Sequence, residues 1–197
     1  MARHVFLTGP PGIGKTTLIH KTIDVLKSSG VPIDGFYTEE VRRNGRRIGF
    51  DVVTVSGKRG TLSRTRDDTG TLSSGRREYR VGQYVVDISS FECLALPLLT
   101  KVNGKDDNEK MVYVIDEIGK MELFSQSFIQ GVRQILDGTG ATILGTIPVP
   151  KGKPLGLVEE IRSRRDVKIF NITNDNRNSI VKEIIATVQD CRKLNGD

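Results

Sequence analysis

The sequence has few of the features that mark secreted, metal-rich or membrane-spanning proteins. Its two cysteines, Cys93 and Cys191, lack CxxC or Cys/His spacing, so we expect reduced thiols rather than disulfides or a metal site. No apolar run approaches the roughly 18 residues that span a bilayer. A strand is expected from His4, which leaves no room for a signal or transit peptide. We therefore expect an intracellular, cytoplasmic protein without membrane contact, with a nuclear location left open.

Tryptophan is absent, and the two histidines lie in an expected strand and an expected helix, where neither is a catalytic candidate. With 197 residues, 37% of them hydrophobic, the chain can bury one sizeable core and is too short for two comfortable ones. We expect a single domain over residues 1–197. No heptad run demands assembly, so the sequence favours a monomer.

Positive charge is concentrated in one segment. The whole chain carries a net charge of +6, and residues 42–80 hold eleven Lys or Arg against four Asp or Glu, a net +7. Such a segment attracts anions, which suits nucleotides, polyphosphates and RNA alike. A solvated, arginine-rich hairpin and loop explains the same composition. RNA binding is weakly supported, because only Phe50 and Tyr79 are near enough to stack on bases.

Apolar runs of strand length alternate with amphipathic runs of helix length, which indicates an α/β fold with a mainly parallel sheet and helices on both faces. A basic β-hairpin with an Asn44–Gly45 turn, followed by a polar mobile loop over 57–75, is expected to occupy about residues 36–78. The remaining expected strands cover 4–8, 79–88, 111–116, 142–147 and 167–171. The expected helices cover 16–29, 89–102, 126–136, 155–164 and 176–192, and 103–110 is a surface connection. The second of these helices is expected to be capped by a serine.

The stretch GPPGIGKTT, residues 9–17, follows the first strand and opens the first helix. It satisfies G-x-x-x-x-G-K-[ST], in which glycine-rich backbone turns its N–H groups onto phosphate oxygens at the positive end of a helix. The lysine can reach the β- and γ-phosphates, and the threonine hydroxyl can bind Mg²⁺. The predicted nucleotide-binding residues are Gly9, Pro10, Pro11, Gly12, Ile13, Gly14, Lys15, Thr16 and Thr17.

The apolar run 112–115 ends in two acidic residues, Asp116 and Glu117. Ligands of open α/β sheets bind at the carboxyl ends of the strands, so Asp116 is expected to bind Mg²⁺ opposite Thr16. Glu117 can then orient and polarise the water that attacks the γ-phosphorus. The alternative for Glu117 is a salt-bridged or exposed side chain. The predicted catalytic pair is Lys15 and Glu117.

Weaker candidates surround this site. Thr146 ends the strand TILGTI and can contact the γ-phosphate or the attacking water, or else serve only the sheet. Lys120 is better explained as an exposed lysine. An arginine commonly stabilises the charge of phosphoryl transfer, and without one hydrolysis is slow. The sequence does not choose among Arg42, Arg46, Arg47, Arg162 and Arg164.

Three function classes fit a phosphate loop. A hydrolase is favoured, because a glutamate placed to activate water is counterproductive in a nucleotide or nucleoside kinase, which must keep water out. The kinase is the second hypothesis, since an arginine-rich segment is typical of kinase lids. A nucleotide-dependent RNA-binding module is the third, with only the basic segment to support it. The physiological purpose stays open.

The stretches HVFLTGPPGIGKTTL, GFYTEEVR, RIGFDVV, VGQYVVD, DEIGKMELFS and GTIPVPKGKP together resemble a family of small, stand-alone nucleoside triphosphatases first described from thermophiles. The resemblance implies a P-loop fold of the class with an additional catalytic glutamate, in which another strand separates the phosphate-loop strand from the DE strand. It also implies Mg²⁺-dependent hydrolysis of ATP, GTP and other nucleoside triphosphates with little base selectivity. In that family the second nucleotide motif corresponds here to Val112, Tyr113, Val114, Ile115, Asp116, Glu117, Ile118 and Gly119.

Overall fold

The computed structural model describes residues 1–68, 78–103 and 110–195 of the chain. The strands are β1 (His4–Gly9), β2 (Ile33–Arg43), β3 (Arg46–Thr54), β4 (Arg59–Thr65), β5 (Tyr79–Val81), β6 (Tyr84–Val86), β7 (Met111–Asp116), β8 (Ala141–Pro148) and β9 (Val167–Asn171). The α-helices are α1 (Lys15–Ser28), α2 (Ile88–Asn103), α3 (Gln126–Asp137), α4 (Gly156–Ser163) and α5 (Val181–Leu194). Two short 3₁₀ helices are η1 (Arg66–Asp68) and η2 (Glu122–Phe124).

The strands form one sheet in the order β5-β6-β4-β3-β2-β7-β8-β1-β9. From β2 to β9 in this order all neighbours are parallel, and from β2 outward to β5 all are antiparallel. Strand β8 lies between β1 and β7, which is the arrangement that the family resemblance implies. The expected α/β fold with a mainly parallel sheet is confirmed.

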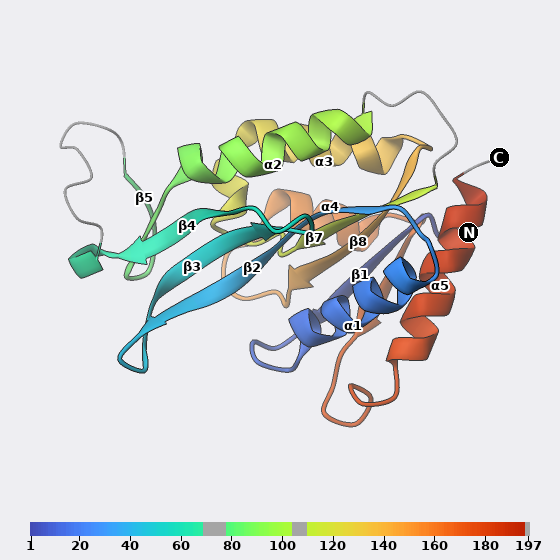
Figure 1. The fold of residues 1–197 in the computed structure, drawn as a ribbon, viewed down its shortest axis with the longest axis horizontal. Coiled ribbons are helices and arrows are strands. Elements are labelled where there is room, and N and C mark those ends of the chain that lie inside the picture. Colours follow the sequence, from blue (N-terminus) through green and yellow to red (C-terminus); the bar gives the residue numbers. More distant parts are fainter. Residues whose placement is uncertain (69–77, 104–109, 196–197) are drawn as a thin grey trace.

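Helices lie on both faces of the sheet. Figure 1 shows α2 and α3 on one face and α1 and α5 on the other. The alternation of side chains in β1 explains both layers: Phe6 enters the core under α2, α3 and α4, whereas Val5 and Leu7 enter the core under α1 and α5. The run MVYVID is apolar on both faces for the same reason.

None of the helices in the described residues is long and apolar enough to cross a bilayer.

The expected hairpin is present, but its first strand belongs to the central sheet. Asn44 and Gly45 have φ angles of 51° and 75°, the left-handed values of a tight two-residue turn. Strand β2 also pairs in parallel with β7, through Phe36 and Ile115 among others. The hairpin β2–β3 therefore extends the sheet that carries the phosphate loop.

The expectation of a mobile loop over 57–75 is wrong for residues 59–65, which form β4. Leu62 is 2% exposed and packs in the main core, and β4 pairs antiparallel with β3. The sequence does not indicate this strand, because it contains a single large apolar side chain, Leu62, among polar residues. Residues 69–75 of that expected loop, and most of the expected connection 103–110, lie outside the described residues.

Three further expectations differ locally from the structure. The strand expected over 79–88 is two short strands, β5 and β6, because Gly82 turns the chain with a φ of 56°. The cap of α2 is Asp87, whose Oδ1 accepts from the Ser90 N–H at 3.0 Å, and not a serine. Helix α5 begins at residue 181 rather than 176, because Asn176 holds the preceding turns by accepting from the Thr173 N–H at 2.8 Å.

Much of the positive charge in the basic segment is paired within the β2–β3–β4 surface. Arg42 and Arg47 both contact Glu40. Arg59 and Arg64 contact Asp51 at 3.0 and 2.7 Å. These pairs agree with a solvated hairpin and leave less free charge for a polyanion.

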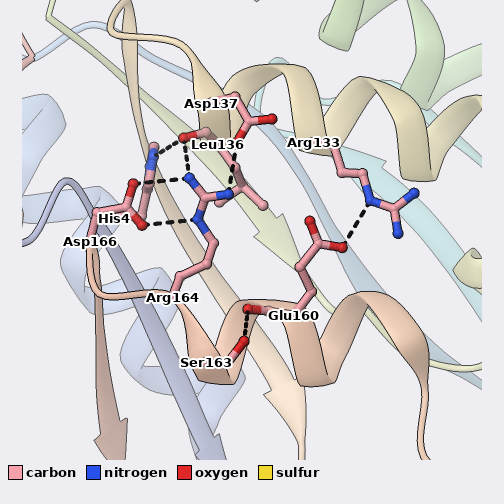
Figure 2. A network of polar contacts seen from close by, with 8 residues as sticks. All are labelled: His4, Arg133, Leu136, Asp137, Glu160, Ser163, Arg164 and Asp166. Carbon is pink, nitrogen blue, oxygen red and sulfur yellow. Dashed lines mark hydrogen bonds and ion pairs between the residues drawn. The ribbon is translucent and has the colours of Figure 1, made fainter.

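A polar network holds the amino-terminal ends of β1 and β9 in place (Figure 2). His4 is fully buried, and its Nδ1 accepts from the Ile143 N–H at 3.0 Å. Nε2 therefore carries the proton and donates to the Leu136 carbonyl oxygen at 3.2 Å. The same oxygen accepts from Arg164, which forms a bidentate pair with Asp166 at 2.9 and 3.0 Å. Burial lowers the pKa of His4 to about 4, so the ring is neutral at neutral pH.

Acidification from pH 7 to pH 5 is expected to lower the free energy of unfolding by about 2 kcal/mol through His4 alone. The unfolded chain binds a proton at the ordinary pKa of 6.5, whereas the folded chain resists protonation down to about 4. Stability is therefore present above pH 6.5 and is lost as the pH falls toward 4. Urea unfolding of the wild type and His4→Asn at both pH values measures this effect. An equal pH dependence in the two proteins would contradict the assignment.

Candidate active site

The phosphate loop leaves β1 and turns directly into α1, as Figure 1 shows. Gly12 and Gly14 have φ angles of 78° and 110°, which residues with a Cβ rarely adopt. These two positions allow the backbone to curl before the first turn of α1. Pro10, Pro11 and Gly12 are exposed, so the loop is open to a ligand.

Lys15 folds back over this loop. Its Nζ donates a hydrogen bond to the Gly9 carbonyl oxygen at 2.6 Å. The ammonium group thus lies at the mouth of the loop, beside the N-terminus of α1, where an anion is favoured by both the lysine and the helix dipole.

The carboxylate of Asp116 joins the phosphate-loop helix to the sheet. Its Oδ2 accepts from the Thr16 hydroxyl at 2.8 Å, and its Oδ1 accepts from the Thr146 hydroxyl at 2.6 Å. Ile115 pairs with Gly145 across β7 and β8, so the next residues of both strands, Asp116 and Thr146, are neighbours at the carboxyl edge. The structure therefore brings together three predicted site residues that are far apart in the sequence.

Thr146 makes a contact that the sequence did not predict. It is fully buried, its hydroxyl donates to Asp116, and its carbonyl oxygen accepts from the Ile118 N–H at 3.0 Å. The hydroxyl of this threonine therefore helps to orient the carboxylate of Asp116.

Burial raises the pKa of Asp116 above its ordinary value, and the hydrogen bonds from Thr146 and Thr16 oppose that rise. Glu117, the next residue, is half-buried and is joined to Asp116 by a cis peptide bond. Burial also raises the pKa of Glu117, while the positive charge of Lys15 lowers it and Asp116 raises it further. A carboxylate with a raised pKa is a stronger base, which suits proton abstraction from water.

The oxygens of Thr16 and Asp116 fit Mg²⁺ chemically. Among residues 1–68, 78–103 and 110–195, no group of three or more His, Cys, Asp or Glu side chains could hold a metal ion. Mg²⁺ does not need such a cage, because it prefers oxygen ligands and usually binds through one or two carboxylates, water and substrate phosphates. A hydroxyl and a carboxylate oxygen that meet at 2.8 Å beside the phosphate loop match this pattern.

Most other residues of the second nucleotide motif, residues 112–119, pack in the interior of the protein. Its residues 112–115 are buried in the two cores, and Ile118 is fully buried. Only Asp116 and Glu117 of this motif bring carboxyl groups to the carboxyl edge beside Thr16 and Lys15. Lys120 is exposed, as expected for a surface lysine.

Of the five candidate arginines, one reaches the carboxyl edge beside the phosphate loop. Arg162 donates to the Thr8 hydroxyl at 3.0 Å and to the Pro148 carbonyl oxygen at 2.6 Å, at the ends of β1 and β8. Arg164 lies near His4, at the amino-terminal ends of the strands and thus away from the phosphate loop (Figure 2). The other three are exposed on the hairpin β2–β3: Arg42, Arg46 and Arg47.

Sequence reasoning missed contacts made by residues outside the two motifs. Arg177, before α5, donates to the Ile13 carbonyl oxygen of the phosphate loop at 3.4 Å. His20 meets the ring of Tyr37 edge-on, with centroids 4.3 Å apart, beside Asp116. Glu122 is buried next to Glu117. Only Glu122 had a visible signal, a charged residue inside the otherwise apolar run MELF; the other contacts depend on long-range pairing.

Comparison with known proteins gives a consistent result. A protein-family model described as NTPase matches residues 4–185. The human protein named cancer-related nucleoside-triphosphatase is 67% identical over 193 residues, which cover 98% of this chain and 100% of that protein.

Two solved structures share the fold over nearly the whole chain. The solution structure of the human cancer-related nucleoside triphosphatase matches with a TM-score of 0.82 at 67% identity and covers 96% of this chain and 98% of its own. The crystal structure of THEP1 from the hyperthermophile Aquifex aeolicus matches with a TM-score of 0.74 at 34% identity and covers 94% and 99%.

Proposed function

We propose that this chain, which belongs to the NTPase family and is a nucleoside-triphosphatase, removes the γ-phosphate with Glu117 as the general base and with Mg²⁺ held at Thr16 and Asp116. The contact that carries the proposal is the hydrogen bond from Thr16 to Asp116 at 2.8 Å, because it joins the phosphate loop to the acidic end of β7. A triphosphate bound by the loop would then have its γ-phosphate between Lys15 and Glu117.

The binding step uses backbone and lysine. The N–H groups of the loop and the first turn of α1 bind phosphate oxygens, and the Lys15 ammonium exchanges its bond to Gly9 for bonds to the β- and γ-phosphates. Bound Mg²⁺ would contribute neutralisation of negative charge on the phosphate oxygens.

In the chemical step Glu117 accepts a proton from water as the water oxygen bonds to the γ-phosphorus. The bond from that phosphorus to the bridging oxygen breaks, and its electron pair stays with the nucleoside diphosphate. Inorganic phosphate is the other product. The raised pKa of Glu117 supports this role, since a stronger base takes the proton more readily from water.

We further propose little base selectivity and slow turnover. The family resemblance implies low base selectivity. The proposed binding residues agree with it, because the contacts proposed for them are to the phosphates and not to the base. Slow turnover is supported by Arg162, whose Nη2 already donates to the Thr8 hydroxyl and to the Pro148 carbonyl oxygen, two acceptors that belong to the fold.

Incubation with γ-labelled ATP tests the reaction class. With Mg²⁺ the label is expected to appear as inorganic phosphate only, whether or not nucleosides, nucleoside monophosphates or RNA are added. EDTA should abolish release, and unlabelled GTP should compete with ATP. Label on an added nucleoside or nucleotide would instead show a kinase, and a large increase in release on adding RNA would favour the RNA-dependent hypothesis.

A further inference from the structure

Glu122 is a buried acidic residue that lies outside the two nucleotide motifs. It opens η2, six residues after Asp116, and is 4% exposed between the apolar neighbours Met121 and Leu123. The charged groups that act on it most are Glu117 and Asp116, which are both acidic. A buried carboxyl group with acidic neighbours is costly, which makes a specific role worth seeking.

The Glu122 carboxyl group anchors the segment that carries Glu117. Its Oε2 accepts a hydrogen bond from the Gly119 N–H at 3.1 Å. Gly119 also lies between the two glutamates: a Cβ placed on it would be 2.8 Å from Glu117 Oε1 and 3.2 Å from Glu122 Oε2. The two oxygens are therefore no farther apart than the sum of these distances, 6.0 Å.

We propose that Glu122 is a positioning residue for hydrolysis: by holding the Gly119 N–H, its carboxyl group fixes the turn 117–119 and thereby the direction of the Glu117 side chain. The inference rests on the proposed function of Glu117. Glu122 does not touch the reacting atoms. It acts through Glu117, which is packed against Gly119 on the side that a Cβ would occupy.

The protonation of Glu122 determines which substitution mimics it. Burial, together with the negative charges of Glu117 and Asp116, raises the pKa of Glu122 to about 8, against the opposing effect of hydrogen bonds from the N–H groups of Glu122 itself and Gly119. The side chain is mainly a neutral acid at pH 7. Glutamine has nearly the same shape and can accept from the same N–H, so it should preserve the turn, whereas alanine cannot.

The test compares Glu122→Ala with Glu122→Gln. For Glu122→Ala we expect kcat to fall by about tenfold or more, because a general base must stay within hydrogen-bond reach of its water. KM, and the affinity for a non-hydrolysable ATP analogue with Mg²⁺, should stay within about twofold, since the phosphate loop is intact. Glu122→Gln should keep kcat within about threefold. Glu159→Ala, an exposed glutamate on α4, is the control.

Gly119→Ala provides a second route if Glu122→Ala does not fold. Its Cβ would displace the Glu117 carboxyl group from 2.8 Å, so kcat should fall while analogue affinity is kept. The proposal is overturned if folded Glu122→Ala keeps kcat within twofold, if Glu122→Gln is as slow as Glu122→Ala, or if Gly119→Ala turns over like the wild type. Thermal unfolding of every variant separates these outcomes from loss of the fold.

Glu117→Gln, measured in parallel, separates this inference from the proposed function. If Glu117→Gln loses kcat and Glu122→Ala does not, only the positioning role fails. If Glu117→Gln turns over like the wild type, the general base itself is wrong. When both hold, the double variant Glu117→Gln with Glu122→Ala should be no slower than Glu117→Gln alone, because both changes remove the same function.

Discussion

Replacement of Glu117 by glutamine is expected to lower kcat by about 10²- to 10⁴-fold, which is the usual contribution of a general base. Glutamine has the size of glutamate but cannot accept the proton of the attacking water. The phosphate loop and the pair Thr16–Asp116 remain, so ATP affinity should change by no more than a few fold. Steady-state kinetics together with calorimetric titration of a non-hydrolysable ATP analogue measure both quantities.

The matched control is Glu159→Gln, which makes the same chemical change on the exposed surface of α4. It should leave kcat and affinity unchanged. Wild-type kcat in Glu117→Gln would reduce Glu117 to a structural residue. A parallel loss of affinity and kcat would instead place Glu117 in nucleotide binding.

Replacement of Lys15 by alanine is expected to weaken ATP binding by roughly 10- to 100-fold, since a hydrogen bond to a charged group contributes about 1.5–3 kcal/mol. The fall in kcat/KM should be larger, because the ammonium group also meets charge that develops during phosphoryl transfer. Lys15 lies in the first turn of α1, and its Nζ donates to the Gly9 carbonyl oxygen at 2.6 Å. Alanine removes this bond, and the other contacts of the loop should remain. Calorimetry and phosphate release test the two effects.

Lys21→Ala is the control for this change, because Lys21 is exposed on the same helix, beyond the phosphate loop. It removes one positive charge from α1 without touching the loop. Equal losses in both variants would indicate a general effect of charge on nucleotide attraction. Wild-type affinity and turnover in Lys15→Ala would remove the phosphate-loop proposal.

The parts of the fold that depend on local sequence could be predicted. The phosphate loop is the glycine-rich stretch between an apolar strand and an amphipathic helix, and β7 coincides with the apolar run 111–116. Asn44–Gly45 encodes its own turn. In these cases the local structure is determined by residues close together in the sequence, so the sequence pattern is enough to predict it.

One strand that depends on a distant partner, and two local details, were not predicted. Strand β4 has one large apolar anchor, Leu62, and takes its backbone hydrogen bonds from β3. Gly82 divides an apparently continuous strand into β5 and β6. Asp87 rather than a serine caps α2, because its carboxyl group reaches the Ser90 N–H.

The site was predicted as a set of residue types, and its internal contacts were not. Thr16 and Asp116 were expected to share a metal, but the hydroxyl of Thr146 on the other oxygen of Asp116 depends on β8 lying beside β7. The choice among arginines also required the fold, since Arg162 and Arg164 are two residues apart and reach opposite edges of the sheet. Glu122 acts through Gly119, a relation that spacing alone does not show.

A crystal structure of the protein with Mg²⁺ and a non-hydrolysable ATP analogue tests the shared metal and triphosphate site most directly. We expect Mg²⁺ bound by the Thr16 hydroxyl, with Asp116 coordinating it directly or through water, and a water molecule between Glu117 and the γ-phosphate. A triphosphate bound away from residues 9–17, or a metal ion that touches neither Thr16 nor the surroundings of Asp116, would contradict it.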